Sequence, residues 1–154
     1  MNVVLYGATG MIGSCIQQEL VSRGHTVTAV VRDPSRVESN PAVIAIKGDQ
    51  TDAADVAVKA KGADAIISAY SPGQQTQQLL DATRALIAGA GLAGVSRVIV
   101  VGGAGSLYVA PGVTVIDSGH LPEAWKPIAV AHRDALEILR QGQDVKFDHV
   151  CIRH

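Results

Sequence analysis

The sequence predicts an α/β protein with a parallel β-sheet, and three observations support that prediction. Short runs rich in valine and isoleucine alternate with stretches of helical periodicity along the chain. Hydrophobic residues make up 47% of the 154 residues but aromatic residues only 3%, and such an aliphatic core suits parallel strands covered by helices. The first apolar run also leads directly into a glycine-rich turn and a helix. We expect a single domain over residues 1–154.

The first third of the chain contains three expected strands and one helix. The first strand is expected at residues 3–6, and a helix should follow it because isoleucine and leucine recur there on one face. That helix should end at Gly24, since glycine favours the position just beyond a helix. The second strand is expected at residues 26–31, before a proline interrupts the run, and the third at residues 43–46.

The middle of the chain contains two helices and the fourth strand. Thr51 or Asp52 can cap a short helix that ends at Gly62, because both side chains accept hydrogen bonds from free backbone N–H groups. The fourth strand is expected at residues 64–69. A long helix over residues 74–90 follows, indicated by apolar residues at helical spacing.

The last third of the chain is less regular. A fifth strand is expected at residues 97–101, and the stretch 106–126 should consist of loops with one short strand at 113–116. A helix over 127–140 starts with a proline, which suits a first turn, and a sixth strand is expected at 147–152. Right-handed crossovers then favour a three-layer Rossmann fold, with about six parallel strands in the order 3-2-1-4-5-6 and helices on both faces.

The turn after the first strand carries a glycine motif. It reads Gly7-Ala8-Thr9-Gly10-Met11-Ile12-Gly13. In a dinucleotide-binding turn Gly7 would permit the tight turn, Gly10 would let the backbone approach a pyrophosphate, and Gly13 would let the helix lie close to the sheet. The phosphates would accept hydrogen bonds from the N–H groups of this segment, including those near Thr9, Met11 and Ile12. The alternative is a strand–helix turn that uses glycine for structural reasons alone.

The residues after the second and third strands bear on the choice of cofactor. Arg32 follows the second strand, and Arg36 is a second cation nearby, so both could pair with the 2′-phosphate of NADP(H). We therefore expect NADP(H) in preference to NAD(H). The alternative has both arginines solvated and Asp33 capping the next turn. Asp49 follows the third strand, where its carboxylate could contact an adenine amine or simply cap its own turn.

Composition and charge argue against several other classes of protein. The formal net charge is −1 and no block of like charge stands out, so neither nucleic acid nor a membrane surface is an expected partner. No metal-ligand spacing, signal peptide or membrane span is visible. Cys15 and Cys151 lie in apolar stretches and are expected to be free buried thiols, which favours a reducing, cytoplasmic location.

Several segments together resemble a known family. They are the glycine motif, Val31-Arg32-Asp33-Pro34, Gly48-Asp49, Ala65-Ile66-Ile67-Ser68-Ala69-Tyr70 and Val100-Val101-Gly102-Gly103-Ala104-Gly105-Ser106-Leu107. In this order they resemble the atypical short-chain dehydrogenase/reductases, in particular the NmrA-like NAD(P)-binding group that includes NADH-flavin reductases. The resemblance covers essentially the whole chain. It implies a Rossmann fold, a nicotinamide cofactor, and reduction of a flavin, quinone or small carbonyl compound.

Two departures from the family pattern affect the expected chemistry. Short-chain dehydrogenases carry Tyr-x-x-x-Lys at the start of the helix before the sixth strand, where this chain has Ala129 and Arg133. A ketone needs a proton donor for its developing alkoxide, whereas a flavin ring accepts electrons itself, so flavin-type reduction or no catalysis is favoured. The chain is also expected to lack most of the C-terminal segment that builds the substrate site in the family.

Candidate contacts to the nicotinamide should follow strands four and five. They are Ala69, Tyr70, Gly102, Gly103 and Ser106. Tyr70 could flank the nicotinamide, donate a proton, or pack at the rim, and Ser106 could hydrogen-bond a substrate or cap its own turn. His120, in the irregular loop, is a further candidate general acid, and His132 is expected on the surface of the last helix.

The sequence therefore predicts an NADP(H)-binding reductase with catalytic candidates Tyr70, Ser106 and His120 and with a small-molecule substrate. The alternative is an NADP(H)-binding regulatory or sensor module without catalysis. The resemblance also implies that the helices at 74–90 and 127–140 could form the face of a homodimer.

Overall fold

A six-stranded parallel sheet forms the centre of the computed structural model, which describes residues 1–142 and 146–152. Its strands are β1 (Asn2–Tyr6), β2 (Thr26–Val31), β3 (Val43–Lys47), β4 (Ala65–Ser68), β5 (Arg97–Gly103) and β8 (Lys146–Ile152). Their order is β3-β2-β1-β4-β5-β8, and every neighbouring pair runs parallel. The predicted 3-2-1-4-5-6 topology is confirmed, with β8 as the sixth strand.

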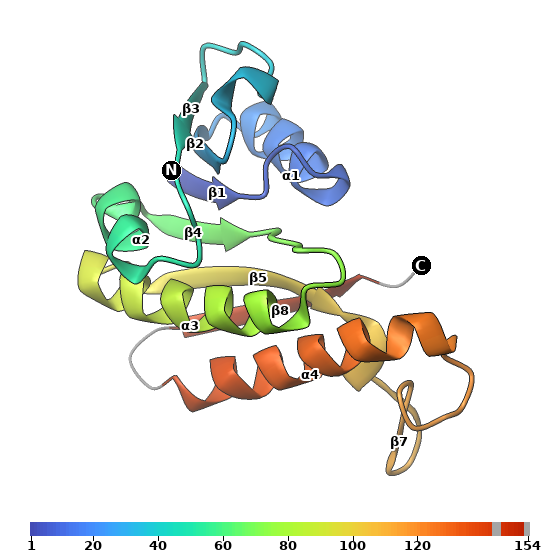
Figure 1. Cartoon of the computed structure of the whole chain (residues 1–154). Helices are drawn as coiled ribbons and strands as arrows, with labels where there is room; N and C mark the ends of the chain where they lie inside the picture. Colours follow the sequence, from blue (N-terminus) through green and yellow to red (C-terminus); the bar gives the residue numbers. More distant parts are fainter. Residues whose placement is uncertain (143–145, 153–154) are drawn as a thin grey trace.

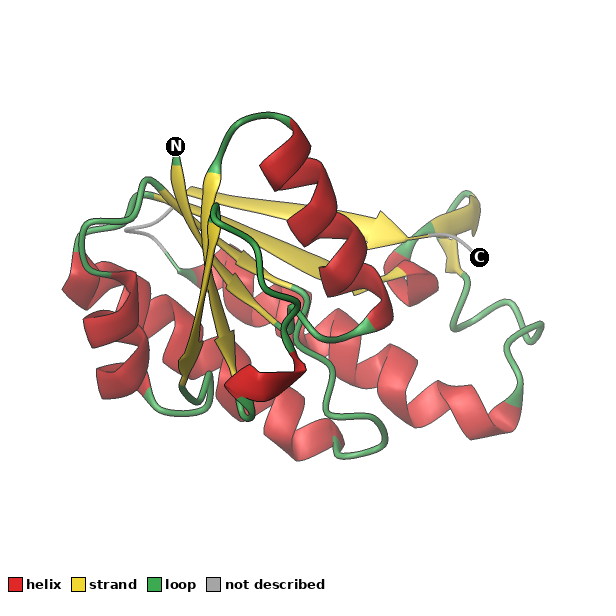
Figure 2. Cartoon of the chain, turned by 90° about the horizontal axis from the view of Figure 1, so that it is seen from above, coloured by secondary structure: helices red, strands yellow, loops and turns green. Residues whose placement is uncertain are grey.

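Helices cover both faces of this sheet, which makes three layers (Figures 1 and 2). They are α1 (Met11–Ser22), α2 (Ala53–Ala60), α3 (Thr76–Ala93) and α4 (Lys126–Gln141). On one face α1 packs Ile16 and Leu20 against β1 and β2. On the other face α2 and α3 bury Val56 and Leu86 against β1, β4 and β5. Both core clusters are built mainly from aliphatic side chains, as the composition predicts.

The cap of α2 illustrates how the local sequence sets these boundaries. The Asp52 carboxylate accepts hydrogen bonds from the N–H groups of Ala54 and Asp55, at 2.9 and 3.3 Å, and the helix starts at the next residue. Of the two predicted caps, Thr51 and Asp52, the aspartate is therefore the one used. Its charge also suits the positive end of the helix dipole.

The segment between β5 and α4 differs from the prediction. The strand expected at 113–116 is shorter, Val113–Thr114 (β7), and it pairs antiparallel with β6 (Tyr108–Ala110) in a separate two-stranded sheet. All three residues of β6 are exposed, so the strand shows no alternation of buried and exposed positions and gives no periodic signal. Single turns of 3-10 helix lie at Pro34–Arg36, Ala104–Ser106 and Glu123–Trp125.

The prediction that both thiols are buried is wrong for Cys15. Its side chain lies on the exposed side of α1, because the next residue, Ile16, takes the position that faces the sheet. The side chain of Cys151 lies outside the described residues. Within the described ranges, no helix is both long and apolar enough to span a bilayer. The cytoplasmic location stays a prediction.

Candidate functional site

The three motif glycines form a tight turn at the carboxyl end of β1. Gly7 has φ +77°, and a Cβ added there would lie 2.4 Å from the carbonyl oxygen of Ala69. A Cβ added at Gly13 would lie 2.0 Å from the carbonyl oxygen of Gly7. Gly10 is less restricted, since its added Cβ would meet only the Gly7 oxygen at 3.3 Å. Two of the glycines are thus required by the fold itself, and Gly10 keeps an exposed position free of a side chain.

The first turn of α1 presents hydrogen-bond donors that the protein does not use. Gly10 is the N-cap and offers no side-chain cap, and the first helical hydrogen bond runs from the N–H of Ser14 to the Gly10 carbonyl at 2.9 Å. Among the residues that the structure describes, nothing accepts from the N–H groups of Met11, Ile12 or Gly13. Unpaired N–H groups at a helix N-terminus form a site for a phosphate anion. The turn therefore fits the pyrophosphate of a dinucleotide.

Two exposed cations, Arg32 and Arg36, follow β2 in the chain. Within the described part of the chain, Arg32 and Arg36 take part in no ion pair. Asp33 does not neutralise them by a direct contact, because its carboxylate accepts from the N–H and the hydroxyl of Ser35 at 3.1 and 2.7 Å. These hydrogen bonds hold the pKa of Asp33 below its usual value.

A hollow of about 510 Å³ separates the glycine turn and α1 from the segment after β2. Thr9, Ser14 and Arg36 are among its lining residues. Gln17 also lines it, and the Oε1 atom of Gln17 is buried without a hydrogen-bond donor among the described residues. Hydroxyl groups beside a guanidinium without an ion pair can hydrogen-bond a phosphate ester. The hollow can therefore receive a phosphorylated ribose.

Asp49 follows β3 at the same edge of the sheet. Its Oδ1 atom accepts from the N–H and the hydroxyl of Thr51, at 2.9 and 2.8 Å, so the carboxylate caps its own turn. Its N–H donates to Asp55 Oδ2 at 2.8 Å. Burial raises the pKa of the neighbouring Tyr6 phenol, and the charges of Asp55 and Asp49 raise it further.

Tyr70 is the principal residue among those predicted to face the nicotinamide. It follows β4 and lines a small cavity together with Ser68, Gly102 and His132. Burial raises the pKa of the Tyr70 phenol, the carboxylate of Asp49 adds to the increase, and the Arg32 guanidinium opposes it. The phenol is therefore protonated at neutral pH and can donate a hydrogen bond.

His132 occupies a different position from the one predicted. It is half-buried, and a Cβ added at Gly103 would lie 3.2 Å from its ring, so α4 packs this ring against the end of β5. The small size of Gly103 thus accommodates the imidazole. No local pattern signals this, because the two residues are 29 positions apart in the sequence. The buried pair Gln50 and Ser68 in the same cavity wall was also missed by sequence reasoning.

The other predicted residues lie around this cavity or away from it. Ala69 is half-buried against Gly7, and Gly102 lines the cavity. Ser106 is half-buried in the 3-10 turn after β5 and does not line the cavity. His120 is exposed in the loop before α4, where its N–H donates to Ser118 Oγ at 3.3 Å. The structure thus brings Tyr70 and Gly102 together with His132, and leaves Ser106 and His120 apart from the cavity.

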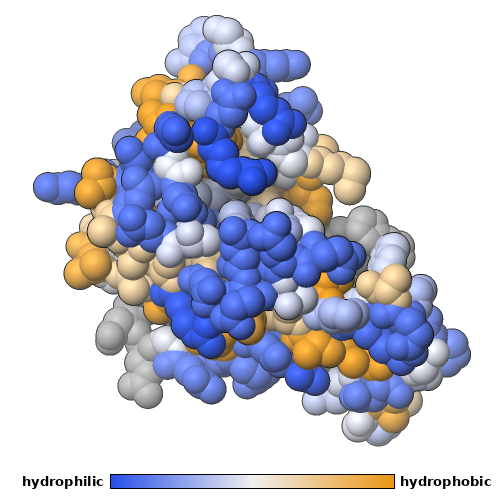
Figure 3. Space-filling model, in the orientation of Figure 1, coloured by the Kyte–Doolittle hydropathy of each residue, from blue (hydrophilic) through white to orange (hydrophobic). Residues whose placement is uncertain are grey.

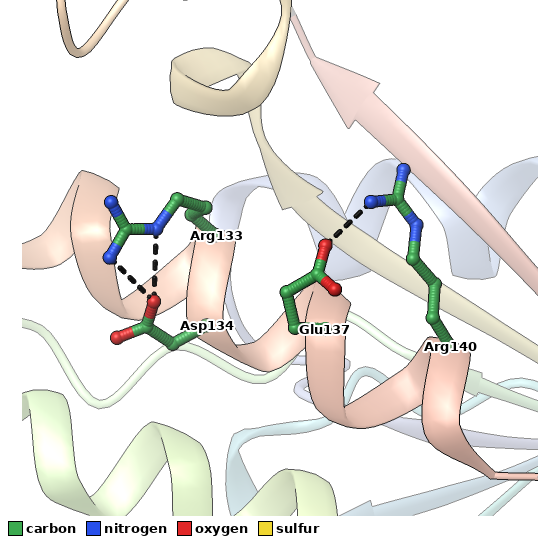
Figure 4. Close-up of polar contacts among 4 residues, drawn as sticks. All are labelled: Arg133, Asp134, Glu137 and Arg140. Carbon is green, nitrogen blue, oxygen red and sulfur yellow. Dashed lines mark hydrogen bonds and ion pairs between the residues drawn. The ribbon is translucent and has the colours of Figure 1, made fainter.

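The two positions of the Tyr-x-x-x-Lys pair have no equivalent chemistry. Ala129 carries no proton donor, and Arg133 lies on the exposed side of α4, where its guanidinium pairs with Asp134 at 2.8 Å (Figure 4). Arg140 and Glu137 form a similar pair one to two turns further on, at 2.6 Å. Among the described residues, no group of three His, Cys, Asp or Glu side chains is placed to hold a metal ion.

A hydrophilic surface adjoins the site over α3. Blue side chains dominate the middle of the face in Figure 3. A hollow of about 580 Å³ at the start of α3 is lined by Thr51, Gln74, Gln75, Thr76, Gln77, Gln78 and Asp81. This surface is polar, in keeping with a crevice that opens to solvent at the carboxyl edge of the sheet.

Comparisons of sequence agree with this geometry. The model of a family described as NAD(P)H-binding matches residues 7–154. The Bacillus subtilis (strain 168) protein YwnB, whose name calls it uncharacterized, is 34% identical over 152 residues, which is 96% of this chain and 69% of YwnB.

Three solved structures share the fold at substantial sequence identity. A candidate epimerase from Bacteroides thetaiotaomicron has a TM-score of 0.91 and 36% identity, covering 97% of this chain and 69% of its own. A candidate exported protein from Burkholderia pseudomallei has a TM-score of 0.86 and 43% identity over 98% of this chain and 71% of its own. A candidate NADH-flavin reductase from Streptococcus pneumoniae TIGR4 has a TM-score of 0.79 and 31% identity over the same two fractions.

Proposed function

Because the chain belongs to the NAD(P)H-binding, NmrA-like family of atypical short-chain dehydrogenase/reductases, we propose that it is a reductase that uses NADPH in preference to NADH and reduces a flavin, quinone or small carbonyl compound. The observation that carries the proposal is the set of unpaired N–H groups of Met11, Ile12 and Gly13 behind the glycine turn. Parallel titrations of the 154-residue chain with NADPH and NADH test the cofactor, and oxidation of NADPH with FMN, FAD or menadione tests the reaction.

The preference for NADPH is supported by Arg32 and Arg36. Both guanidinium groups are exposed, and no described carboxylate pairs with them. A 2′-phosphate placed between the end of β2 and the hollow lined by Arg36 would gain charge-assisted hydrogen bonds that a ribose hydroxyl cannot make. NADH, which has no 2′-phosphate, would share the other contacts and lack these.

The side chains present at the site favour one class of hydride acceptor over another. NADPH supplies a hydride when bound. Tyr70 carries a protonated phenol, while the positions of the family's tyrosine and lysine hold Ala129 and Arg133. A ketone would require a positioned acid for its alkoxide, whereas a flavin or quinone stabilises the added electrons itself. We therefore favour a flavin or quinone as the acceptor.

A second candidate is a non-catalytic NADP(H)-binding regulatory or sensor module. The observation that favours it is the same absence of an acid at position 129 and of a buried cation at position 133. NADPH binding without oxidation in the presence of FMN, FAD or menadione would select this function. Oxidation with any of the three selects the reductase.

Replacing Gly10 by alanine tests the phosphate position with little cost to the fold. An added Cβ meets only the Gly7 carbonyl oxygen, at 3.3 Å, and φ at this residue is −81°, which alanine adopts freely. We expect the free energy of unfolding to change by less than about 1 kcal/mol, while the affinities for NADPH and NADH fall at least about tenfold. Calorimetric titration and urea unfolding measure the two quantities. An unchanged affinity would remove the pyrophosphate from this turn.

Two substitutions of Tyr70 distinguish the role of its hydroxyl group from the role of its aromatic ring. Because burial raises the pKa of this phenol above 10.0, it stays protonated below that pH, and its contribution to turnover should not vary between pH 6 and pH 9. If the phenol donates a proton or hydrogen bond, Tyr70→Phe should lower kcat for NADPH oxidation by about tenfold to a hundredfold. If only its ring matters, Tyr70→Phe should match the wild type and Tyr70→Ala should weaken NADPH binding.

The oligomeric state and the domain organisation are also proposals. Helices α3 and α4, expected to form a dimer face, pack against each other along part of their surfaces. We propose that residues 1–154 act as one domain and associate through the remaining exposed side of these helices. Light scattering on the eluted chain would show a mass near 32 kDa for a dimer, twice the 16.0 kDa of the monomer.

A further inference from the structure

A pair of buried polar side chains lies behind the proposed nicotinamide site. Gln50 follows β3 and is 4% exposed, and Ser68 ends β4 and is 2% exposed. The Ser68 hydroxyl donates to Gln50 Oε1 at 2.8 Å. The cavity beside them is walled by aliphatic side chains of α3 and α4, including Leu79 and Leu139. Polar groups in such surroundings are costly unless they are paired, so each of the two depends on the other.

The loop that carries Gln50 is fixed on both sides. The Asp49 carboxylate caps the N–H of Thr51, the N–H of Asp49 donates to Asp55, and Asp52 caps α2. All these hydrogen bonds belong to the surface of the loop. Gln50 alone among its residues is buried. Its side chain reaches the end of β4, although β2 and β1 lie between β3 and β4 in the sheet order.

Ser68 in turn connects to the residues of the site. Its hydroxyl oxygen accepts a long hydrogen bond from the N–H of Tyr70, at 3.4 Å. The intervening residue, Ala69, donates its N–H to the carbonyl of Tyr6 at 3.0 Å and places its own carbonyl against Gly7. A displacement of the end of β4 would therefore move both Tyr70 and the first glycine of the turn.

We propose that Gln50 is a positioning residue, which through its hydrogen bond to Ser68 holds the end of β4, and with it Tyr70, in the geometry that receives the nicotinamide. The proposal rests on the proposed function, because it assigns a role within that site. Gln50 is buried behind Ser68, so we assign it no contact of its own with the reacting atoms or the pyrophosphate. Its effect is the alignment of residues that do, and alignment influences the rate more than the affinity.

The experiment compares Gln50→Met, Ser68→Ala and the double variant with the wild-type chain. Three quantities are measured: the Kd for NADPH, the rate of NADPH oxidation at saturating NADPH and FMN, and the nicotinamide emission of bound NADPH. We expect each single substitution to lower the rate about tenfold to a hundredfold and to change the Kd by less than about threefold. The double variant should lose no more than the more affected single variant, because both substitutions remove one shared hydrogen bond.

Thr83→Val is the matched control. Thr83 is 4% exposed and lines the same cavity, but its hydroxyl donates to the Leu79 carbonyl of its own helix at 2.8 Å. It should lower the urea midpoint much as Ser68→Ala does and leave the rate within about twofold of wild type. An equal loss of rate in Thr83→Val, additive losses in the double variant, or unchanged rates would each overturn the proposal.

The emission of bound NADPH distinguishes this proposal from the proposed reductase function. If the wild type binds NADPH but reduces none of the acceptors, the reductase assignment fails. The positioning role then requires that Gln50→Met and Ser68→Ala alter the emission of bound NADPH at unchanged affinity, and unaltered emission overturns it. A wild-type chain that does not bind NADPH overturns both.

Discussion

Gly13→Ala is expected to lower the free energy of unfolding by about 3 kcal/mol or more and to weaken NADPH binding more than about a hundredfold. The added Cβ would lie 2.0 Å from the Gly7 carbonyl oxygen and 2.7 Å from its carbon. Both atoms belong to the backbone of the glycine turn, so no side chain can rotate to make room. Either α1 moves away from β1, or the turn that presents the N–H groups of residues 11–13 changes shape. Urea unfolding and calorimetric titration measure the two effects.

Gly91→Ala is the matched control for this substitution. Gly91 lies within α3, and an added Cβ there would meet nothing within 4 Å. Alanine should therefore raise the free energy of unfolding by about 0.5–1 kcal/mol, because it restricts the unfolded chain and favours the helix, and NADPH affinity should not change. A folded Gly13→Ala variant with wild-type affinity would show that close packing of α1 on β1 is not needed for the phosphate site.

The architecture could be predicted because its signals are local. The period of apolar residues marks α1, and the aspartate at position 52 marks the start of α2, where the structure shows the cap. Glycines next to the first strand mark a turn whose geometry only glycine permits at Gly7 and Gly13. By contrast, β6 consists of three exposed residues that pair with β7, and no period of two can appear in so short and so exposed a strand.

The proposed site could be predicted only on its adenosine and pyrophosphate side. The residues on that side follow β1 and β2 directly in the chain, so their roles can be judged from the neighbouring sequence. The contacts of His132 with Gly103 and of Gln50 with Ser68 join distant segments, and each residue type alone looks ordinary. The sequence predicts a surface position for His132, because a polar residue beside Arg133 on an amphipathic helix usually faces solvent. Gly103, at the end of β5, has no side chain and leaves space for the imidazole ring. The apolar pattern of α4 alone gives no sign of this space.

The combined substitution of Arg32 and Arg36 by alanine is expected to remove most of the preference for NADPH. Each guanidinium would make a charge-assisted contact to the 2′-phosphate worth about 1.5–3 kcal/mol, which is about tenfold or more in Kd. Both arginines are free of ion pairs in the described residues, so removing them leaves no buried carboxylate without a partner and should not destabilise the fold. The double variant should therefore bind NADPH about a hundredfold more weakly, while its Kd for NADH changes less than about threefold.

Arg140→Ala controls for the loss of surface charge. Its guanidinium pairs with Glu137 on the exposed side of α4 (Figure 4). An exposed pair of this kind contributes about 0.3–0.5 kcal/mol, so the free energy of unfolding should fall by no more than that. The affinities for NADPH and NADH should not change. Titrations with NADPH and NADH at two salt concentrations complete the test, because a contact to the 2′-phosphate should make NADPH binding the more salt-sensitive of the two. Equal losses for both cofactors in the double arginine variant would assign these residues to the shared pyrophosphate and leave the choice between NADPH and NADH to other parts of the site.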